Sequence, residues 1–201
     1  MSTEIGLFEA IYSQRAIRRL KPDPVPDDLI HKLIEAATKA PSGANRQPWA
    51  FIVIRDRATK EKLGEWYLDT WNRTYGAIPE DQRAQLEGMA RVYRAADHLA
   101  HHLSDVPVLI LACARGASQY GSLFPAVQNL LLAARGLGLG ASLTTLHKGH
   151  EREVKELLGI PETVETVALI PIGYPIGKYG PTTRRPVEEI MHLERWDGTK
   201  G

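Results

Sequence analysis

Arginine is concentrated at two points of this 201-residue sequence that lie far apart along the chain. Near the start, the segment QRAIRRLK contains Arg15, Arg18 and Arg19, and near the end Arg184 and Arg185 precede a proline. The fixed fork of donors on a guanidinium suits a phosphate dianion, and distant segments commonly combine to form such sites. Each cluster alone is typical of a solvated surface. The two clusters therefore predict a phosphate site only if other motifs of the chain support it.

Other patterns that could support chemistry are less informative. The glycines of RGLGLGAS follow an expected helix and precede an expected strand, the reverse of a dinucleotide-binding loop, so they predict a helix end and a tight turn. The cluster His98, His101, His102 and Asp105 has helical spacing, but nothing nearby completes a metal site, and we expect no metal.

The single cysteine, Cys113, excludes an internal disulfide and is interpreted as a buried strand residue. The sequence has no Gly-x-Ser-x-Gly elbow, which argues against covalent hydrolysis.

Hydrophobic periodicity predicts the elements that must position these residues. Helices are expected at 5–13, after a cap at Asp27 as far as 40, in two pieces over 59–103 with a break at 77–81, at 124–134 and at 151–158. Apolar and β-branched runs predict strands at 50–54, 107–114, 141–146 and 167–173, and the second of these, apolar on both faces, should be central. The chain shows no repeat and no linker. We therefore expect one α+β domain of three layers over 1–201, with 59–104 as a helical excursion.

Composition limits the partners of this chain. Its 25 lysines and arginines against 24 acidic residues give a net charge of +1, so neither nucleic acid nor an anionic membrane is an expected partner. A run of about 18 apolar residues is absent, as is a basic leader with a long apolar core, and a cytoplasmic protein is expected. The 124–134 helix is almost wholly apolar, which predicts burial on all sides or a position between two subunits. We therefore predict a homodimer.

Four motifs, in this order along the chain, resemble the nitroreductase family of FMN-dependent enzymes. They are RAIR at 15–18 with the following PVP, the loop APSGANRQPW at 40–49, the helix, turn and strand PAVQNLLLAARGLGLGASLTTL, and the closing GYP and TRRPVEEI. The PSGxNxQPW element is specific, and the resemblance spans nearly the whole chain. It implies a nitroreductase-like three-layer fold, with a central mixed sheet flanked by helices, in an interlocked homodimer.

The resemblance also implies where FMN binds, in two clefts between the subunits. The phosphate is assigned to Gln14, Arg15, Ala16, Arg18 and Arg184. The ring and ribityl chain are assigned to the loop residues Pro41, Ser42, Gly43, Asn45 and Gln47, the first four of these coming from the partner subunit, and to the strand Leu143, Thr144 and Thr145.

Two of these positions depart from the family pattern. Many relatives have Arg-Arg-Ser where this chain has Gln14-Arg15-Ala16, so a modest affinity for FMN is expected, and some have a third threonine in place of Leu143. Thr144 and Thr145 are the candidate catalytic residues, because a hydroxyl or backbone N–H there could reach flavin N5 and stabilise the charge of the reduced ring.

The activity implied is a ping-pong transfer of hydride from NADH or NADPH through flavin N5 to a nitroaromatic, a quinone or a similar small planar acceptor. Because the flavin supplies this chemistry, no acid–base pair is required of the protein. The 59–104 excursion is interpreted as a lid, whose aromatic residues either stack on a planar substrate or pack against the body: Trp66, Tyr67, Trp71 and Tyr75.

Several alternatives stay open from the sequence. A relative could fragment its flavin to a benzimidazole, could prefer a deazaflavin, or could bind flavin as a sensor without turnover. Relatives that dehalogenate iodotyrosine grip an amino acid with charged lid residues. No such residues can be placed in this sequence, so that activity is not expected.

Overall fold

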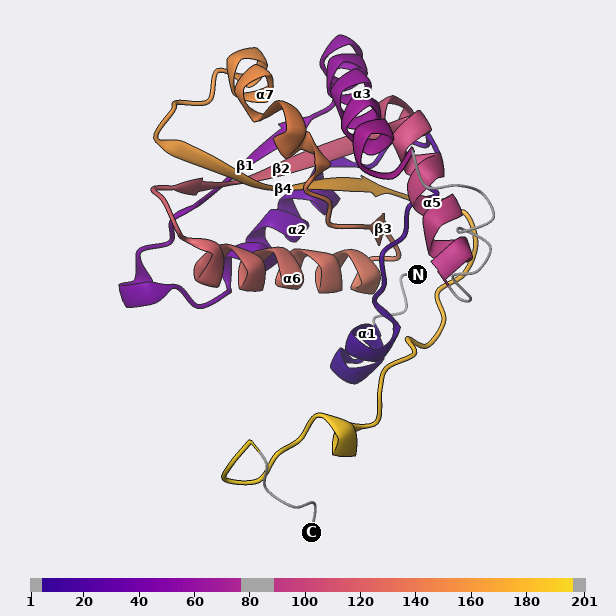
Figure 1. Cartoon of the computed structure of the whole chain (residues 1–201), viewed down its shortest axis with the longest axis vertical. Helices are drawn as coiled ribbons and strands as arrows, with labels where there is room; N and C mark the ends of the chain where they lie inside the picture. The colour runs from indigo at the N-terminus through magenta and orange to yellow at the C-terminus, as the bar shows by residue number, and fades with distance from the viewer. Residues whose placement is uncertain (1–4, 77–88, 197–201) are drawn as a thin grey trace.

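The computed structural model describes residues 5–76 and 89–196, which form three layers around one sheet (Figure 1). Helices α3 (Arg57–Trp71), α5 (Met89–His102) and α7 (Glu151–Leu158) cover one face of the sheet, and α2 (Asp27–Thr38) and α6 (Tyr120–Gly136) cover the other. The predicted α+β class and the three layers are confirmed. Among the described residues, no helix combines the length and apolar character needed to cross a bilayer.

The sheet has the strand order β1 (Trp49–Ile54), β2 (Val108–Arg115), β4 (Val164–Gly173) and β3 (Gly140–Ala141). Every pair of neighbours is antiparallel, so within the described ranges the expected mixed sheet is an antiparallel one. The central position predicted for β2 is confirmed, because all of its residues except Arg115 are buried. Cys113 lies in this strand as predicted, and burial raises the pKa of its thiol to about 11.

The strand predicted at 141–146 is the clearest error of the sequence analysis. Only Gly140 and Ala141 form β3, although Thr144 still pairs with Leu169 of β4 through both backbone hydrogen bonds, at 3.0 and 2.9 Å. The same register places Ser142 opposite Pro171. Proline has no N–H to donate to the ladder, so the pairing is interrupted there. The chain then turns into a 3₁₀ helix, η4 (Leu146–His150).

The helices lie near their predicted positions, but several of their ends differ. Helix α1 begins at Leu7, α2 ends at Thr38, and α6 extends beyond the predicted 124–134 at both ends. Asp27 is the first residue of α2 rather than its cap, and its carboxylate instead accepts a hydrogen bond from Arg55 at 2.7 Å. Helix α3 starts two residues before the expected excursion because Asp56 caps it by accepting from the Thr59 N–H at 2.8 Å. A π-helical turn, η2 (Asn72–Gly76), follows α3, and a 3₁₀ turn, η3 (Leu103–Asp105), follows α5. The break expected at 77–81 lies outside the described residues.

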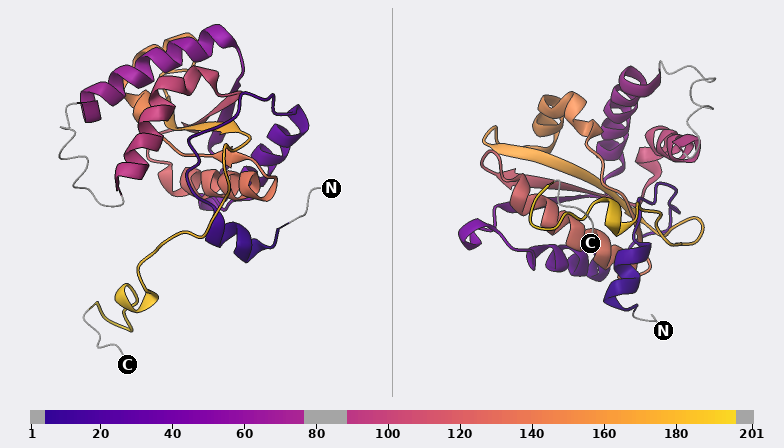
Figure 2. Two further views of the ribbon diagram at one scale, coloured as in Figure 1. Left: turned by 90° about the vertical axis from the view of Figure 1, so that its right-hand side faces the viewer. Right: turned by 60° about the horizontal axis from the view of Figure 1, so that its bottom comes forward.

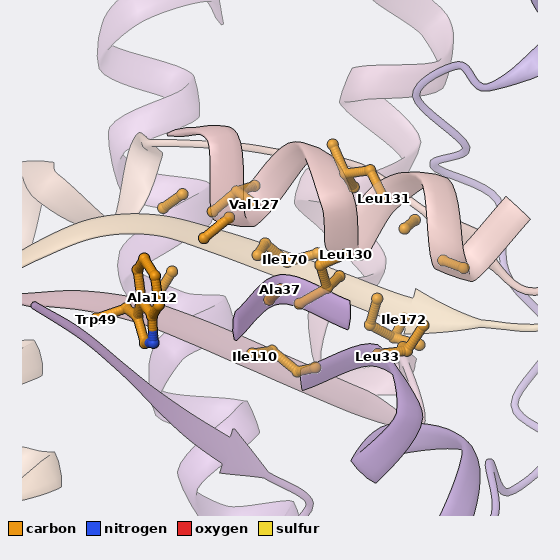
Figure 3. Packing of buried hydrophobic residues seen from close by; sticks show 14 of the residues in the cluster. Leu33, Ala37, Trp49, Ile110, Ala112, Val127, Leu130, Leu131, Ile170 and Ile172 are labelled. Carbon is orange, nitrogen blue, oxygen red and sulfur yellow. The ribbon is translucent and has the colours of Figure 1, made fainter. Parts of the chain in front are cut away.

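The larger core cluster lies between the sheet and the pair α2 and α6, as Figure 3 shows. In it, Leu33 of α2 and Leu130 of α6 are fully buried with Ile110 and Ile170 of the sheet. Most of α6 is therefore covered within a single chain, and only a few positions such as Phe124, 42% exposed, face outward. The apolar character of this helix consequently does not require a second subunit to cover it.

Two other segments leave apolar residues uncovered. The short helix α1 (Leu7–Ser13) lies outside the layers, and the chain after β4 leaves the body as a long tail that contains a 3₁₀ turn, η5 (Val187–Glu189) (Figures 1 and 2). These two segments hold most of the exposed large hydrophobic side chains: Leu7, Phe8, Ile11, Tyr12, Val187, Ile190, Met191, Leu193 and Trp196. Such a surface is typical of a protein–protein contact.

Candidate active site

The residues after α1 form an extended arm along the edge of the sheet. The Ile17 N–H donates to the Ala141 carbonyl at 2.9 Å, and the Arg19 carbonyl accepts from the Ile176 N–H at 3.0 Å. The arm packs so closely on Gly140 that a Cβ there would lie 2.6 Å from Leu20 Cδ2 and 2.8 Å from Ile17 Cγ2. The arm is thus fixed by its backbone and its aliphatic side chains, which leaves its arginines available for other contacts.

A cavity of about 440 Å³ opens between this arm, α5 and the segment after β4. No aspartate or glutamate belongs to its described lining, and no ion pair involves its cations within the described ranges. These cations are Arg15, Arg18, Arg19, Arg91, Arg94 and Lys178. The arrangement fits an anionic group, because exposed guanidinium donors without carboxylate partners are suited to phosphate.

Three of the predicted site residues meet behind the cavity. The hydroxyls of Tyr67 and Thr144 lie 2.9 Å apart in a hydrogen bond, and the charge of Arg18 acts on Tyr67. Burial lowers the pKa of Arg18 and raises that of Tyr67. A guanidinium nevertheless keeps its charge in proteins, so Arg18 is a fixed positive charge beside the Thr144 segment.

Thr144 and Thr145 differ in the groups that they leave unused. The N–H of Thr144 donates to Leu169, and its hydroxyl is bonded to Tyr67 and accepts from the Leu146 N–H at 3.5 Å. Thr145 is exposed, and within the described residues its only backbone hydrogen bond is the one its carbonyl accepts from Lys148 at 3.0 Å. Leu143 is half-buried and packs against the larger core cluster. Of the two threonines, Thr145 is the one with donors available to a ligand.

Two polar side chains without partners flank this segment. Ser142 Oγ and both ring nitrogens of His147 are buried and make no hydrogen bond within the described residues. Burial lowers the pKa of His147 to about 4, so its ring is neutral at pH 7. Neither residue was singled out from the sequence. His147 lies in η4, whose packing against α3 is a long-range contact that local pattern does not show.

The loop predicted to line the flavin lies at the opposite end of the molecule from the arm (Figures 1 and 2). It contains the turn η1 (Gly43–Asn45), and its exposed residues include Pro41, Gly43, Asn45 and Gln47. Ser42 is half-buried and organises the loop, because its hydroxyl accepts from the Gln47 N–H at 3.0 Å. Within one chain, the structure does not bring this loop to the cavity.

Arg184 also lies away from the cavity within one chain. It is exposed in the tail, where its guanidinium donates to the neighbouring Thr183 carbonyl at 2.8 Å. The tail passes the end of α1, where the Thr182 N–H donates to the Tyr12 carbonyl at 3.1 Å. Of the residues assigned to the phosphate, Arg15, Ala16 and Arg18 line the cavity, whereas Gln14 ends α1 and is not part of the lining.

The aromatic residues of the excursion mostly pack against the protein. Tyr67 and Trp71 are buried, and the indole N–H of Trp71 donates to Asp97 of α5 at 3.1 Å. Trp66 stacks on His150 with ring centroids 6.1 Å apart. Tyr75 is 37% exposed, but its ring packs against that of Trp71, with the ring centroids 4.7 Å apart. Of the two roles left open for these residues, the structure favours packing of α3 against α5 and η4.

The sequence analysis missed three of the cationic residues that line the cavity, Arg91, Arg94 and Lys178. The spacing of Arg91 and Arg94 places both on one face of a helix, which was a usable signal. Their relation to the arm, however, depends on how α5 packs. Among the described residues, which include the neighbouring histidines, no group of three or more possible metal ligands was found. His102 instead pairs with Asp105 at 3.1 Å.

Comparison with known proteins places the chain in a family. The model of the nitroreductase family matches residues 11–174, and the chain therefore belongs to this family of oxidoreductases. The NADH dehydrogenase of Thermus thermophilus is 31% identical over 206 residues, covering 90% of this chain and 93% of its own. The iodotyrosine deiodinase of Thermotoga neapolitana is 31% identical over 188 residues, covering 92% of this chain and 95% of its own.

The fold is shared with solved structures of such proteins. A crystal structure of oxidized iodotyrosine deiodinase bound to FMN and 3-iodo-L-tyrosine matches with a TM-score of 0.76 at 24% identity. The match covers 96% of this chain and all of the other. The nitroreductase-like fold expected from the four motifs is confirmed.

Proposed function

We propose that this protein binds FMN and transfers hydride from NADH or NADPH to a small planar acceptor, a quinone or a nitroaromatic. The observation that carries the proposal is the cationic cavity, whose lining includes Arg15, Ala16 and Arg18 from the motif assigned to the FMN phosphate. FMN bound to a protein of the same fold supports the choice of flavin. When bound, FMN supplies the hydride chemistry, and the protein has to hold and orient it.

The residues of the chain would divide this work. Arg15 would pair with the phosphate, and Arg18 would add a fixed charge beside the Thr144 segment. The bond between Tyr67 and Thr144 would keep that segment in place. Thr145 would offer its N–H or hydroxyl to the flavin, because the N–H of Thr144 donates to Leu169 and its hydroxyl is hydrogen-bonded to Tyr67.

We further propose a homodimer in which the second copy completes the site. The apolar surface of α1 and of the tail supports a subunit contact. The 41–47 loop and Arg184, both implicated by the resemblance, lie away from the cavity of their own chain, and a second copy could present them to it. Light scattering at micromolar concentration should give about twice the chain mass of 22.3 kDa. A stable FMN-loaded monomer would exclude the shared site.

The purified protein itself provides the test of the activity. Mass spectrometry of the released cofactor should give FMN, and the protein should show the two-band absorbance of an oxidised flavin. Anaerobic NADH or NADPH should bleach these bands, and a quinone or nitroaromatic should restore them. A deazaflavin, a flavin that neither nucleotide bleaches, or consumption of the reduced FMN in oxygen would each replace the proposal with one of the alternative activities.

A further inference from the structure

We infer that the cavity contains a second anion-binding subsite, formed by Arg91 and Arg94 of α5 together with Lys178. This subsite would take a phosphate or carboxylate group on the molecule that reacts with the flavin. The inference rests on the proposed function, since it concerns the partner of a bound FMN. It adds residues of α5 and of the segment after β4 that the motif for the FMN phosphate does not include.

The first argument is the balance of charge. The FMN phosphate carries about two negative charges near neutrality, which the arm residues Arg15 and Arg18 can match. The lining supplies four more cations, and no carboxylate of the described lining faces them. Like charges in one cavity repel one another. Because the whole chain has a net charge of only +1, this excess is local, and it leaves room for a second anion after FMN has bound.

The second argument is the position of the arginines on a fixed helix. Arg91 and Arg94 are three residues apart and therefore project from the same face of α5. The helix is held by buried Leu99 and Ala100 and by the bond from Trp71 to Asp97 at 3.1 Å. The two guanidinium groups line the cavity from α5, whereas Arg15 and Arg18 line it from the arm. A second ligand could reach them while FMN occupies the arm.

The third argument concerns the kind of ligand. Val92, Ala95 and Ile176 give the lining an aliphatic part that suits a planar organic molecule. A zwitterionic amino acid would leave its ammonium group without an acidic partner in the described lining. The cavity therefore favours a ligand with net negative charge. The phosphates of a nicotinamide nucleotide and the carboxylate of an acceptor share this chemistry.

Binding to the FMN-loaded protein tests the subsite without turnover. Calorimetric titration with pyrophosphate should show binding that Arg91→Gln and Arg94→Gln each weaken about tenfold, the loss of one charge-assisted hydrogen bond. Both variants should retain FMN as firmly as the parent. Arg115→Gln removes an exposed arginine outside the cavity lining and is the matched control for net charge. If pyrophosphate binding does not change, or if FMN affinity falls along with it, a separate subsite does not exist.

Kinetic half-reactions then identify the source of the anion. If the subsite binds the donor, both variants should slow flavin reduction by NADH and NADPH but not by reduced nicotinamide riboside, which has no phosphate. If it binds the acceptor, they should raise the KM for 4-nitrobenzoate but not for nitrobenzene. Equal effects on charged and uncharged partners would overturn the inference. Failure of the parent protein to hold FMN would instead overturn the proposed function.

Discussion

The α3 side of the protein and the cavity beside α5 use arginine in opposite ways. Arg57 of α3 contacts Glu61 and Asp105 at 2.6 and 3.2 Å, and Arg73 of η2 contacts Asp69 of α3 at 2.7 Å. The cavity gathers six cations and no carboxylate in its described lining. Exposed ion pairs contribute only about 0.2–1 kcal/mol each, but they cancel charge locally. The difference separates arginines that are paired within the fold from cavity cations that are available to bind an anionic ligand.

The largest effect should come from His147, whose buried ring nitrogens make no hydrogen bond within the described residues. Its pKa of about 4 in the folded protein lies below the ordinary value of 6.5, so at acid pH the unfolded chain binds the extra proton. This contribution to stability is complete above pH 6.5 and is lost as the pH falls toward 4. Denaturant unfolding should show a loss of about 2 kcal/mol between about pH 7 and about pH 5 from this residue.

The variant His147→Leu isolates that effect. Its free energy of unfolding should fall less steeply over the same range, because no buried imidazole has to be kept neutral. His31→Leu, at an exposed position of α2, controls for the loss of a histidine. Identical acid dependence in the parent and His147→Leu would show that the pKa is not depressed.

The junction between the body and the arm should be nearly as sensitive. Gly140→Ala would place a Cβ 2.6 Å from Leu20 and 2.8 Å from Ile17. Overpacking of this kind costs about 1–3 kcal/mol, and displacement of the arm should also weaken FMN binding. Gly121→Ala in α6 meets nothing within 4 Å and is the control. Thermal unfolding and FMN titration measure both effects, and an unchanged Gly140→Ala protein would show that the contact is not tight.

A smaller effect should distinguish the two uses of arginine directly. Arg135 of α6 donates to Ser13 Oγ at 2.8 Å, pairs with Glu9 at 3.2 Å and lies 4.4 Å from the ring centroid of Tyr179. Arg135→Ala should cost about 1–2 kcal/mol of folding stability. Arg94→Ala should change it by less than about 0.5 kcal/mol. Comparable destabilisation in the two variants, measured by denaturant unfolding, would remove the distinction.

The sequence predicted what depends on local pattern. Periodicity placed the helix at 151–158 on the observed residues, and the double-faced apolar run at 107–114 predicted the central strand. The strand at 141–146 failed because its pairing depends on Pro171, which belongs to a different strand. Arg91 and Arg94 were missed for the same reason, because helical spacing does not show which other segment of the chain packs beside that face of the helix. Arg18 was singled out by the arginine cluster and was assigned to the phosphate through the resemblance, whereas Thr144 was proposed through the resemblance. Packing through Tyr67 is what brings the two together.

The central claim is that the arm binds the FMN phosphate, and paired affinities for FMN and riboflavin test it most directly. Arg18→Ala and Arg184→Ala should each raise the Kd for FMN by roughly ten- to a hundredfold, because each removes a charge-assisted bond of about 1.5–3 kcal/mol. Riboflavin, which has no phosphate, should bind nearly as it does to the parent, and Arg115→Ala should alter neither affinity. Ala16→Ser, which restores the hydroxyl common in relatives, should tighten FMN alone. If both arginine variants hold FMN as firmly as the parent, or if they lose riboflavin equally, the phosphate does not bind at the arm.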